Sequence, residues 1–241
     1  MRAETRRQLK QDRFSRATLD AAEATAHWTV EHQSKLIAGG IALAVIVAAV
    51  LGVWYHFDQQ DQKAGVELSA AIRTLDTQVR PAGMPPQPDF PSFASSKERA
   101  TEAHKQFQAI VDQYPHTHSA KIARYFLGRT SADLGDKAAA EQEFKEVISS
   151  GNSDISALAE MALASVYRST GRGKDAVEIY KKLADKPTRT VGKATAQLEL
   201  AGTYEEQQQP GEAKRIYEQV QKENPSTQAA QIASTKLQEI Q

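Results

Sequence analysis

A GRGK run at residues 171–174 is the first of three short patterns whose residue types could support chemistry. It resembles the end of a phosphate-binding loop, which also needs an earlier glycine, a Ser or Thr after the lysine, and a preceding strand. Arg168 and Asp175 stand where the glycine and the hydroxyl residue would be, and no strand pattern precedes them. The glycines are therefore interpreted as a tight turn, and no phosphate chemistry is predicted.

The other two patterns are a histidine pair and a carboxylate pair. His116 and His118 could bind a metal ion, but no third ligand lies nearby in the sequence, and a zinc site needs at least three. Glu205 and Glu206 are adjacent on an expected helix and would point to different sides, so they do not form an acid–base pair. With no cysteine in the chain, thiolate metal sites, disulfides and a cysteine nucleophile are excluded. We predict no catalytic residue, metal or cofactor, with an enzyme of unrecognised type as the alternative.

Composition points to an all-α protein without nucleic-acid partners. The 241 residues carry 30 Lys plus Arg and 30 Asp plus Glu, so there is no bulk positive charge to attract a phosphate backbone. Aromatic residues make up only 7%, and alanine and glutamine are abundant, which favours helices over sheets.

Residues 36–55 form an uninterrupted apolar stretch without a charged residue. Twenty helical residues span about 30 Å, which matches the hydrocarbon thickness of a bilayer. Trp54 and Tyr55 close the stretch, where aromatic rings favour the membrane interface. The sequence therefore predicts a transmembrane helix. A cleaved signal peptide is the alternative, but its apolar region would be shorter and nearer the N-terminus.

The distribution of basic residues predicts the orientation of this helix. Residues 1–35 form a basic tail with seven Lys or Arg, whereas residues 56–79 carry two. Basic flanks stay in the cytoplasm. The N-terminus is therefore predicted on the cytoplasmic side of a bacterial inner membrane, and the residues after the membrane helix in the periplasm. Within the helix, small residues recur at every fourth position and predict a contact with another helix, unless the spacing is chance. These residues are Gly40, Ala44, Ala48 and Gly52.

Two segments separate the membrane helix from the remainder. Residues 56–79 read as a polar helix that continues the membrane helix outward. Residues 80–95 follow as a linker, because five of the nine prolines lie within residues 80–91 and no helix crosses that density.

Residues 96–241 contain a repeat of 36 to 37 residues. A small residue is followed four positions later by an aromatic one, and each unit reads as a helix–turn–helix whose neighbours must stack to bury their apolar faces. The small residues are Ala103, Ala140, Ala176 and Ala213, and the aromatic residues are Phe107, Phe144, Tyr180 and Tyr217. Residues 96–114 supply half a repeat, and residues 228–241 supply a capping helix.

This pattern resembles the tetratricopeptide repeat (TPR). Leu followed by Gly or Ala, then Tyr, Ala, an aromatic residue and Pro stand at the family's relative positions. The family's early Trp is replaced by Arg124, Glu160 and Gln197. The resemblance implies an α-solenoid in which the first helix of each unit lines a concave surface.

Mapping the family's inward positions onto the chain gives a candidate groove for a protein partner. Tyr125, Met161 and Leu198 would form an apolar stripe, with Arg129 and Arg168 beside it to steer acidic partners. Ser165 and Glu205 complete the predicted lining. The alternative is that the stripe packs against residues 56–79 or the capping helix.

The order of tail, membrane helix and repeats is similar to YfgM-type ancillary subunits of the bacterial Sec translocon. That resemblance implies protein partners such as the translocon or a periplasmic chaperone, and neither nucleic acid nor a small-molecule substrate. The alternative within binding proteins is an envelope scaffold for cell division or outer-membrane assembly.

Overall fold

The computed structural model describes residues 32–81, 83–85, 92–151 and 153–240, so most of the predicted N-terminal tail lies outside the described residues. Within the described part, the regular elements are helices apart from two strands of two residues each. This confirms the all-α prediction. The helices are α2 (Gln33–Asp76), α3 (Ser96–Gln113), α4 (His118–Asp133), α5 (Lys137–Ser149), α6 (Ser153–Ser169), α7 (Gly173–Asp185), α8 (Lys193–Glu206), α9 (Pro210–Glu223) and α10 (Gln228–Glu239). The chain divides into two compact units between His56 and Phe57.

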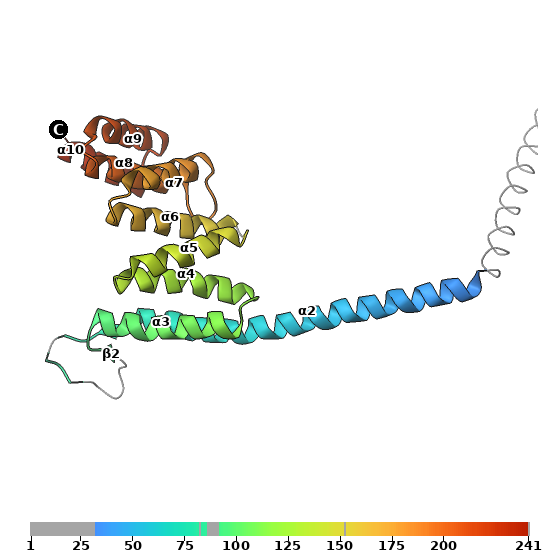
Figure 1. Ribbon diagram of the computed structural model, residues 1–241. Coiled ribbons are helices and arrows are strands. Elements are labelled where there is room, and N and C mark those ends of the chain that lie inside the picture. The colour runs from blue at the N-terminus through green and yellow to red at the C-terminus, as the bar shows by residue number, and fades with distance from the viewer. Residues whose placement is uncertain (1–31, 82, 86–91, 152, 241) are drawn as a thin grey trace, which may run out of the picture. The chain divides into compact units, whose positions relative to one another are not determined.

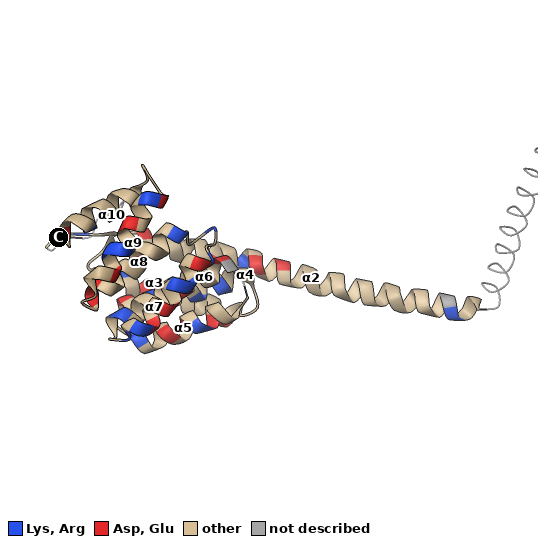
Figure 2. Ribbon diagram, turned by 90° about the horizontal axis from the view of Figure 1, so that it is seen from above, with Lys and Arg blue, Asp and Glu red and all other residues tan. Residues whose placement is uncertain are grey.

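The first unit contains the apolar part of α2. The sequence of α2 has no charged residue between Lys35 and Asp58, and Figure 2 shows a long stretch of this helix without blue or red. Among the described helices, α2 is the one long and apolar enough to cross a membrane, and its apolar window is not buried within the chain. The helix continues to Asp76 and not to the predicted Val79, because the chain enters strand β1 (Gln78–Val79) there.

In the second unit, successive helices stack as antiparallel pairs (Figure 1). Polar side chains fix where several of these helices begin, because each accepts a hydrogen bond from a backbone N–H of the first turn. The capping residues are Ser95, Thr117, Asp136 and Thr227. Gly135 and Gly171 adopt φ of 91° and 77° after α4 and α6, a left-handed conformation that glycine tolerates at a tight turn.

The core of the second unit follows the repeat that the sequence predicts. The four small repeat residues are fully buried, and the four aromatic residues are at most 2% exposed. A close approach of paired helices explains the small residues: a Cβ on Gly128 would lie 2.8 Å from Cε1 of Phe144. The solenoid prediction is therefore confirmed in its helix-packing details.

The start of the repeat domain differs from the prediction. Residues 57–76 of α2 pack against α3, and Ala64, Leu68 and Ala71 join the buried cluster that contains Phe107. Polar contacts add to this packing: the Tyr114 hydroxyl donates to Glu67 Oε1 at 2.8 Å. The predicted half repeat is thus a complete hairpin of α2 and α3, and the compact unit begins at Phe57 instead of residue 96.

The proline-rich segment therefore lies inside this hairpin and does not link two modules. Strands β1 and β2 (Ser92–Phe93) pair in parallel at its base, with Gln78 opposite Ser92 and Val79 opposite Phe93. The Arg80 guanidinium donates to the Ser92 carbonyl at 3.0 Å. The two ends of the segment are held together, whatever the path of the residues between them.

Candidate functional site

The predicted groove residues lie on α4, α6 and α8, the first helices of three successive hairpins. Tyr125, Met161 and Leu198 occupy equivalent positions, and we call them the ladder. All three are half-buried and pack against the core of the repeat domain. The cluster that contains the buried residues of α2 includes Ile122 and Phe126, and the ladder is not part of it. The ladder thus keeps partial exposure after the described residues have packed.

Tyr125 is the most closely held member of the ladder. Its ring meets the Phe126 ring edge-on at 5.3 Å between centroids, and it lies 6.1 Å from the Phe144 ring. Such aromatic pairs add to the stability that burial alone provides. Tyr125 therefore packs against the core and also contributes to the exposed face.

The two predicted steering arginines have different surroundings. Arg129 is exposed, and its guanidinium lies 5.9 Å from the centroid of the Phe126 ring. Arg168 instead joins α6 to α8: it donates to Glu199 Oε2 at 2.7 Å and forms a two-pronged pair with Glu206. Hydrogen bonds from Arg168 hold the pKa of the Glu206 carboxyl below its usual range. Arg129 is the groove cation that remains available to a partner.

Ser165 and Glu205 complete the predicted lining and differ in burial. Ser165 is exposed on α6. Glu205 is half-buried on α8, near Tyr217 of α9. Burial raises the pKa of the Tyr217 hydroxyl, and the Glu205 carboxylate raises it further. Glu205 thus belongs partly to the α8–α9 contact and offers less to a partner than Ser165 does.

The small residues of the membrane helix are uncovered in the described chain. A Cβ added at Gly40 or at Gly52 would meet nothing within 4 Å, and Ala44 and Ala48 are exposed. Their contact with another helix stays a prediction.

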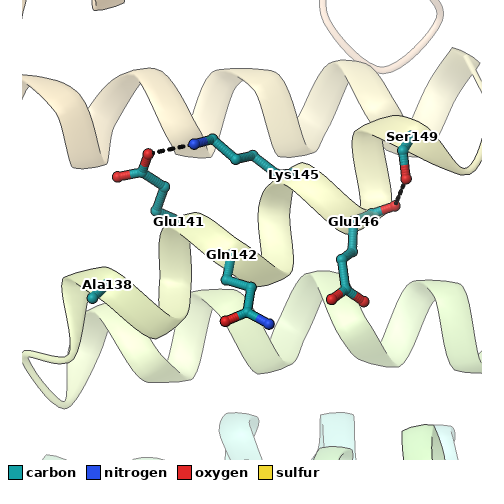
Figure 3. Close-up of a pocket in the computed structure, with 6 residues that line it drawn as sticks. All are labelled: Ala138, Glu141, Gln142, Lys145, Glu146 and Ser149. Carbon is teal, nitrogen blue, oxygen red and sulfur yellow. Dashed lines mark hydrogen bonds and ion pairs between the residues drawn. The ribbon is translucent and has the colours of Figure 1, made fainter.

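An open hollow of about 520 Å³ lies on α5 (Figure 3). Its lining comes from that helix alone: Ala138, Glu141, Gln142, Lys145, Glu146 and Ser149. Glu141 accepts from Lys145 at 2.6 Å and from Arg172 at 2.9 Å, so its charge is already balanced. An arrangement of paired ions on one exposed helix face stabilises a surface and lacks the convergent groups of an active site.

Metal ligation is equally unsupported by the described residues, where no group of three or more His, Asp or Glu side chains could hold an ion. His116 lies 6.5 Å from the Phe57 ring, edge to face. His116 thus packs beside α2, next to the hairpin of α2 and α3.

A polar contact between paired helices was not predicted from the sequence. Arg124 of α4 pairs with Glu143 at 3.1 Å and with Glu146, both on α5. Glu160 of α6 pairs with Lys182 of α7 in the next hairpin. The polar residues that replace the family's early Trp could have indicated such contacts. Their partners lie about 20 residues further along the chain, so the sequence spacing alone does not identify them.

Comparison with known proteins agrees with this architecture. The family model described as tetratricopeptide repeat-like domain matches residues 26–179, and a tetratricopeptide repeat model matches residues 195–227. No curated protein sequence matches the chain. Among solved structures, a single-substitution variant of a putative kinesin light chain with nearly identical TPR-like repeats, from Podosopora anserina, superposes with a TM-score of 0.57 at 17% identity. The match covers 75% of this chain and 85% of that one. A second structure of those repeats gives 0.57 at 16% identity, over 75% and 86%. At such identities the likeness concerns the fold alone.

Proposed function

Because this chain belongs to the tetratricopeptide repeat-like domain family, we propose that it is a membrane-anchored scaffold that binds partner proteins through the ladder. Repeats of this kind act as protein-interaction scaffolds, because stacked hairpins present a long continuous surface and not an enclosed pocket. The observation that carries the proposal is the ladder itself. Its three apolar side chains repeat at equivalent positions and keep partial exposure on rigid helices.

The charge around the ladder suits an extended or helical segment with an acidic residue. Apolar anchors provide most of the affinity at such surfaces, and exposed charges tune the association rate and specificity. Arg129 would meet that acidic residue. The pairing of Arg168 with Glu199 and Glu206 would instead keep α6 and α8 at the correct separation.

Met161→Glu is expected to reduce partner capture severalfold, because it places a charge in the middle of an apolar contact surface. The full chain, purified in detergent, would be compared with wild type in pull-downs from native membranes and in thermal melts. The melting temperature should stay within about 4 °C of wild type, the shift that roughly 1 kcal/mol produces in a domain of this size. Gln231→Glu adds the same charge at an exposed position of α10 and serves as the control. Equal capture by both variants would contradict a binding role for the ladder.

The membrane anchor is the second part of the proposal. We propose that residues 36–55 cross the bacterial inner membrane with the N-terminus in the cytoplasm and the repeats in the periplasm. The support is the uncovered apolar surface of α2, whose exposure to water would be unfavourable, together with the basic residues that precede it.

The absence of native cysteine allows a direct test of this orientation. A Ser92→Cys variant should react with a membrane-impermeant maleimide in intact spheroplasts. A Ser15→Cys variant should react only after the membrane is permeabilised. The reverse pattern would place the repeats in the cytoplasm and exclude a periplasmic role.

The proposed partners are components of the Sec translocon or a periplasmic chaperone, with an envelope scaffold for cell division or outer-membrane assembly as the alternative. The support is the similarity in layout to YfgM-type subunits. Crosslinking in native membranes followed by mass spectrometry separates the two, because each predicts a different set of captured proteins.

A further inference from the structure

The position of the family's early Trp carries a polar pair that changes along the solenoid. The spacing of the repeats makes Arg124, Glu160 and Gln197 equivalent on the first helices, and Glu146, Lys182 and Gln219 equivalent on the second. In the α4–α5 hairpin the contact is Arg124 with Glu146, and in the α6–α7 hairpin it is Glu160 with Lys182. The α8–α9 hairpin has two neutral amides there. Among the described residues, this third position is therefore the one without an ion pair.

A pocket of about 230 Å³ lies at this third position, between α7, α8 and α9. Gln197 lines it and is only 5% exposed, and its Oε1 is buried without a hydrogen-bond partner among the described residues. Gln219 also lines the pocket but donates to Glu223 at 2.9 Å. A buried amide oxygen without a partner is destabilising, and in this orientation it would be satisfied by a hydrogen-bond donor. After rotation of the amide, its N–H donors would lie at the same place and would be satisfied by an acceptor.

Cations outnumber carboxylates among the residues that line the pocket. Lys181, Lys193 and Arg215 line it, with Asp185 as the one carboxylate among the lining residues. Lys193 pairs with Glu223 at 2.8 Å, and Arg215 pairs with Glu212 at 2.8 Å. Both pairs are solvent-exposed, so each is weak and costs little to break.

Lys181 lies near Tyr204, the aromatic residue among those that line the pocket. Its Nζ lies 5.8 Å from the centroid of the Tyr204 ring. Ala184, Leu200 and Ile216 add apolar side chains to the lining. The lining thus combines three cations, a buried amide and these apolar side chains.

From this combination we propose that the pocket between α7, α8 and α9 binds the acidic side chain of a partner peptide. A glutamate would place its methylene groups against the apolar side chains of the lining and its carboxylate between Lys181 and Arg215. Rotation of the Gln197 amide exchanges its oxygen for its N–H donors, and these would then donate to the carboxylate. The pocket shares no residue with the ladder, so the inference stands whether or not the ladder binds a partner.

The test uses the full chain in detergent and a fluorescein-labelled hexaglutamate peptide with a C-terminal amide. Its glutamate side chains are then the only carboxylates besides that of the label, which the control peptide carries too. Fluorescence anisotropy should detect binding of this peptide and not of the matching hexaglutamine peptide. Equal affinities for the two peptides would mean that the pocket does not recognise a carboxylate, and would overturn the proposal.

The sharpest variant transfers the ion pair of the α6–α7 hairpin to the third position. Gln197→Glu with Gln219→Lys keeps the net charge and closes the pocket with the pair that Glu160 and Lys182 form. It should weaken hexaglutamate binding about tenfold or more, with a melting temperature equal to or above that of wild type. Unchanged affinity in this folded variant would overturn the proposal.

A second pair of variants remains informative if the transferred ion pair prevents folding. Lys181→Gln with Arg215→Gln removes two charges from the lining, and Lys174→Gln with Lys214→Gln removes two exposed charges from the same helices. Only the first double variant should weaken binding. Equal weakening would indicate general charge attraction and overturn the proposal. Binding that Met161→Glu abolishes and the first double variant leaves intact would also overturn it, because the peptide would then be held at the ladder.

Discussion

Phe144→Ala is expected to lower the free energy of unfolding by about 3–5 kcal/mol. The Phe144 side chain is 1% exposed, and its ring fills the space that the missing Cβ of Gly128 leaves between α4 and α5. Alanine would forfeit the transfer free energy of the ring and leave a cavity in a rigid contact between helices. The measurement is denaturant unfolding of the full chain in detergent, monitored by far-ultraviolet circular dichroism.

Ile232→Ala provides the control for that experiment. Ile232 is a large apolar residue on α10, but it is 43% exposed, so its removal should change stability by no more than about 0.5 kcal/mol. If Phe144→Ala were as mild as this control, the aromatic residue would not be part of the core, and the packing of the hairpins would need a different explanation.

Leu68→Ala is the second large effect, at about 2–5 kcal/mol. Leu68 is 7% exposed in the cluster that joins residues 57–76 of α2 to α3 and α4. Its truncation should loosen the first hairpin, and α3 amide protons should then exchange with solvent faster, as measured by hydrogen–deuterium exchange mass spectrometry.

The same helix offers a matched control for Leu68. Val66 lies two residues away and is 70% exposed, so Val66→Ala removes apolar atoms of similar chemistry from a side of α2 that packs against nothing buried. Equal effects of the two substitutions would mean that α2 does not belong to the repeat domain, and that α3 lacks a partner helix.

The repeats were predictable because their signal is local and recurs. Ala176 and Tyr180 lie four residues apart, so one turn of helix places them together, and the same spacing returns in each hairpin. The first hairpin was not predictable by that route. About 20 residues separate its helices at α2 and α3, and this insertion hides the repeat spacing.

The ladder was predictable as a set of equivalent positions, but the surroundings of its charged neighbours were not. Arg168 reaches Glu199 and Glu206, which are 31 and 38 residues away in the chain, and no sequence spacing selects these carboxylates over others. The pocket between α7, α8 and α9 was not predictable for the same reason. That Gln197 Oε1 is buried without a partner among the described residues depends on how α7, α8 and α9 pack, which a single sequence does not specify.

The short pairing of β1 with β2 has a consequence for how the chain tolerates change in length. Because Gln78 is held opposite Ser92, the segment between them is a closed loop whose ends do not move when residues are added. Doubling the length of such a loop costs only about 0.6 kcal/mol in closure entropy. An epitope or a small folded module inserted between Gly83 and Pro86 would therefore leave the hairpins in register, and homologous chains would be free to vary most in length at this point.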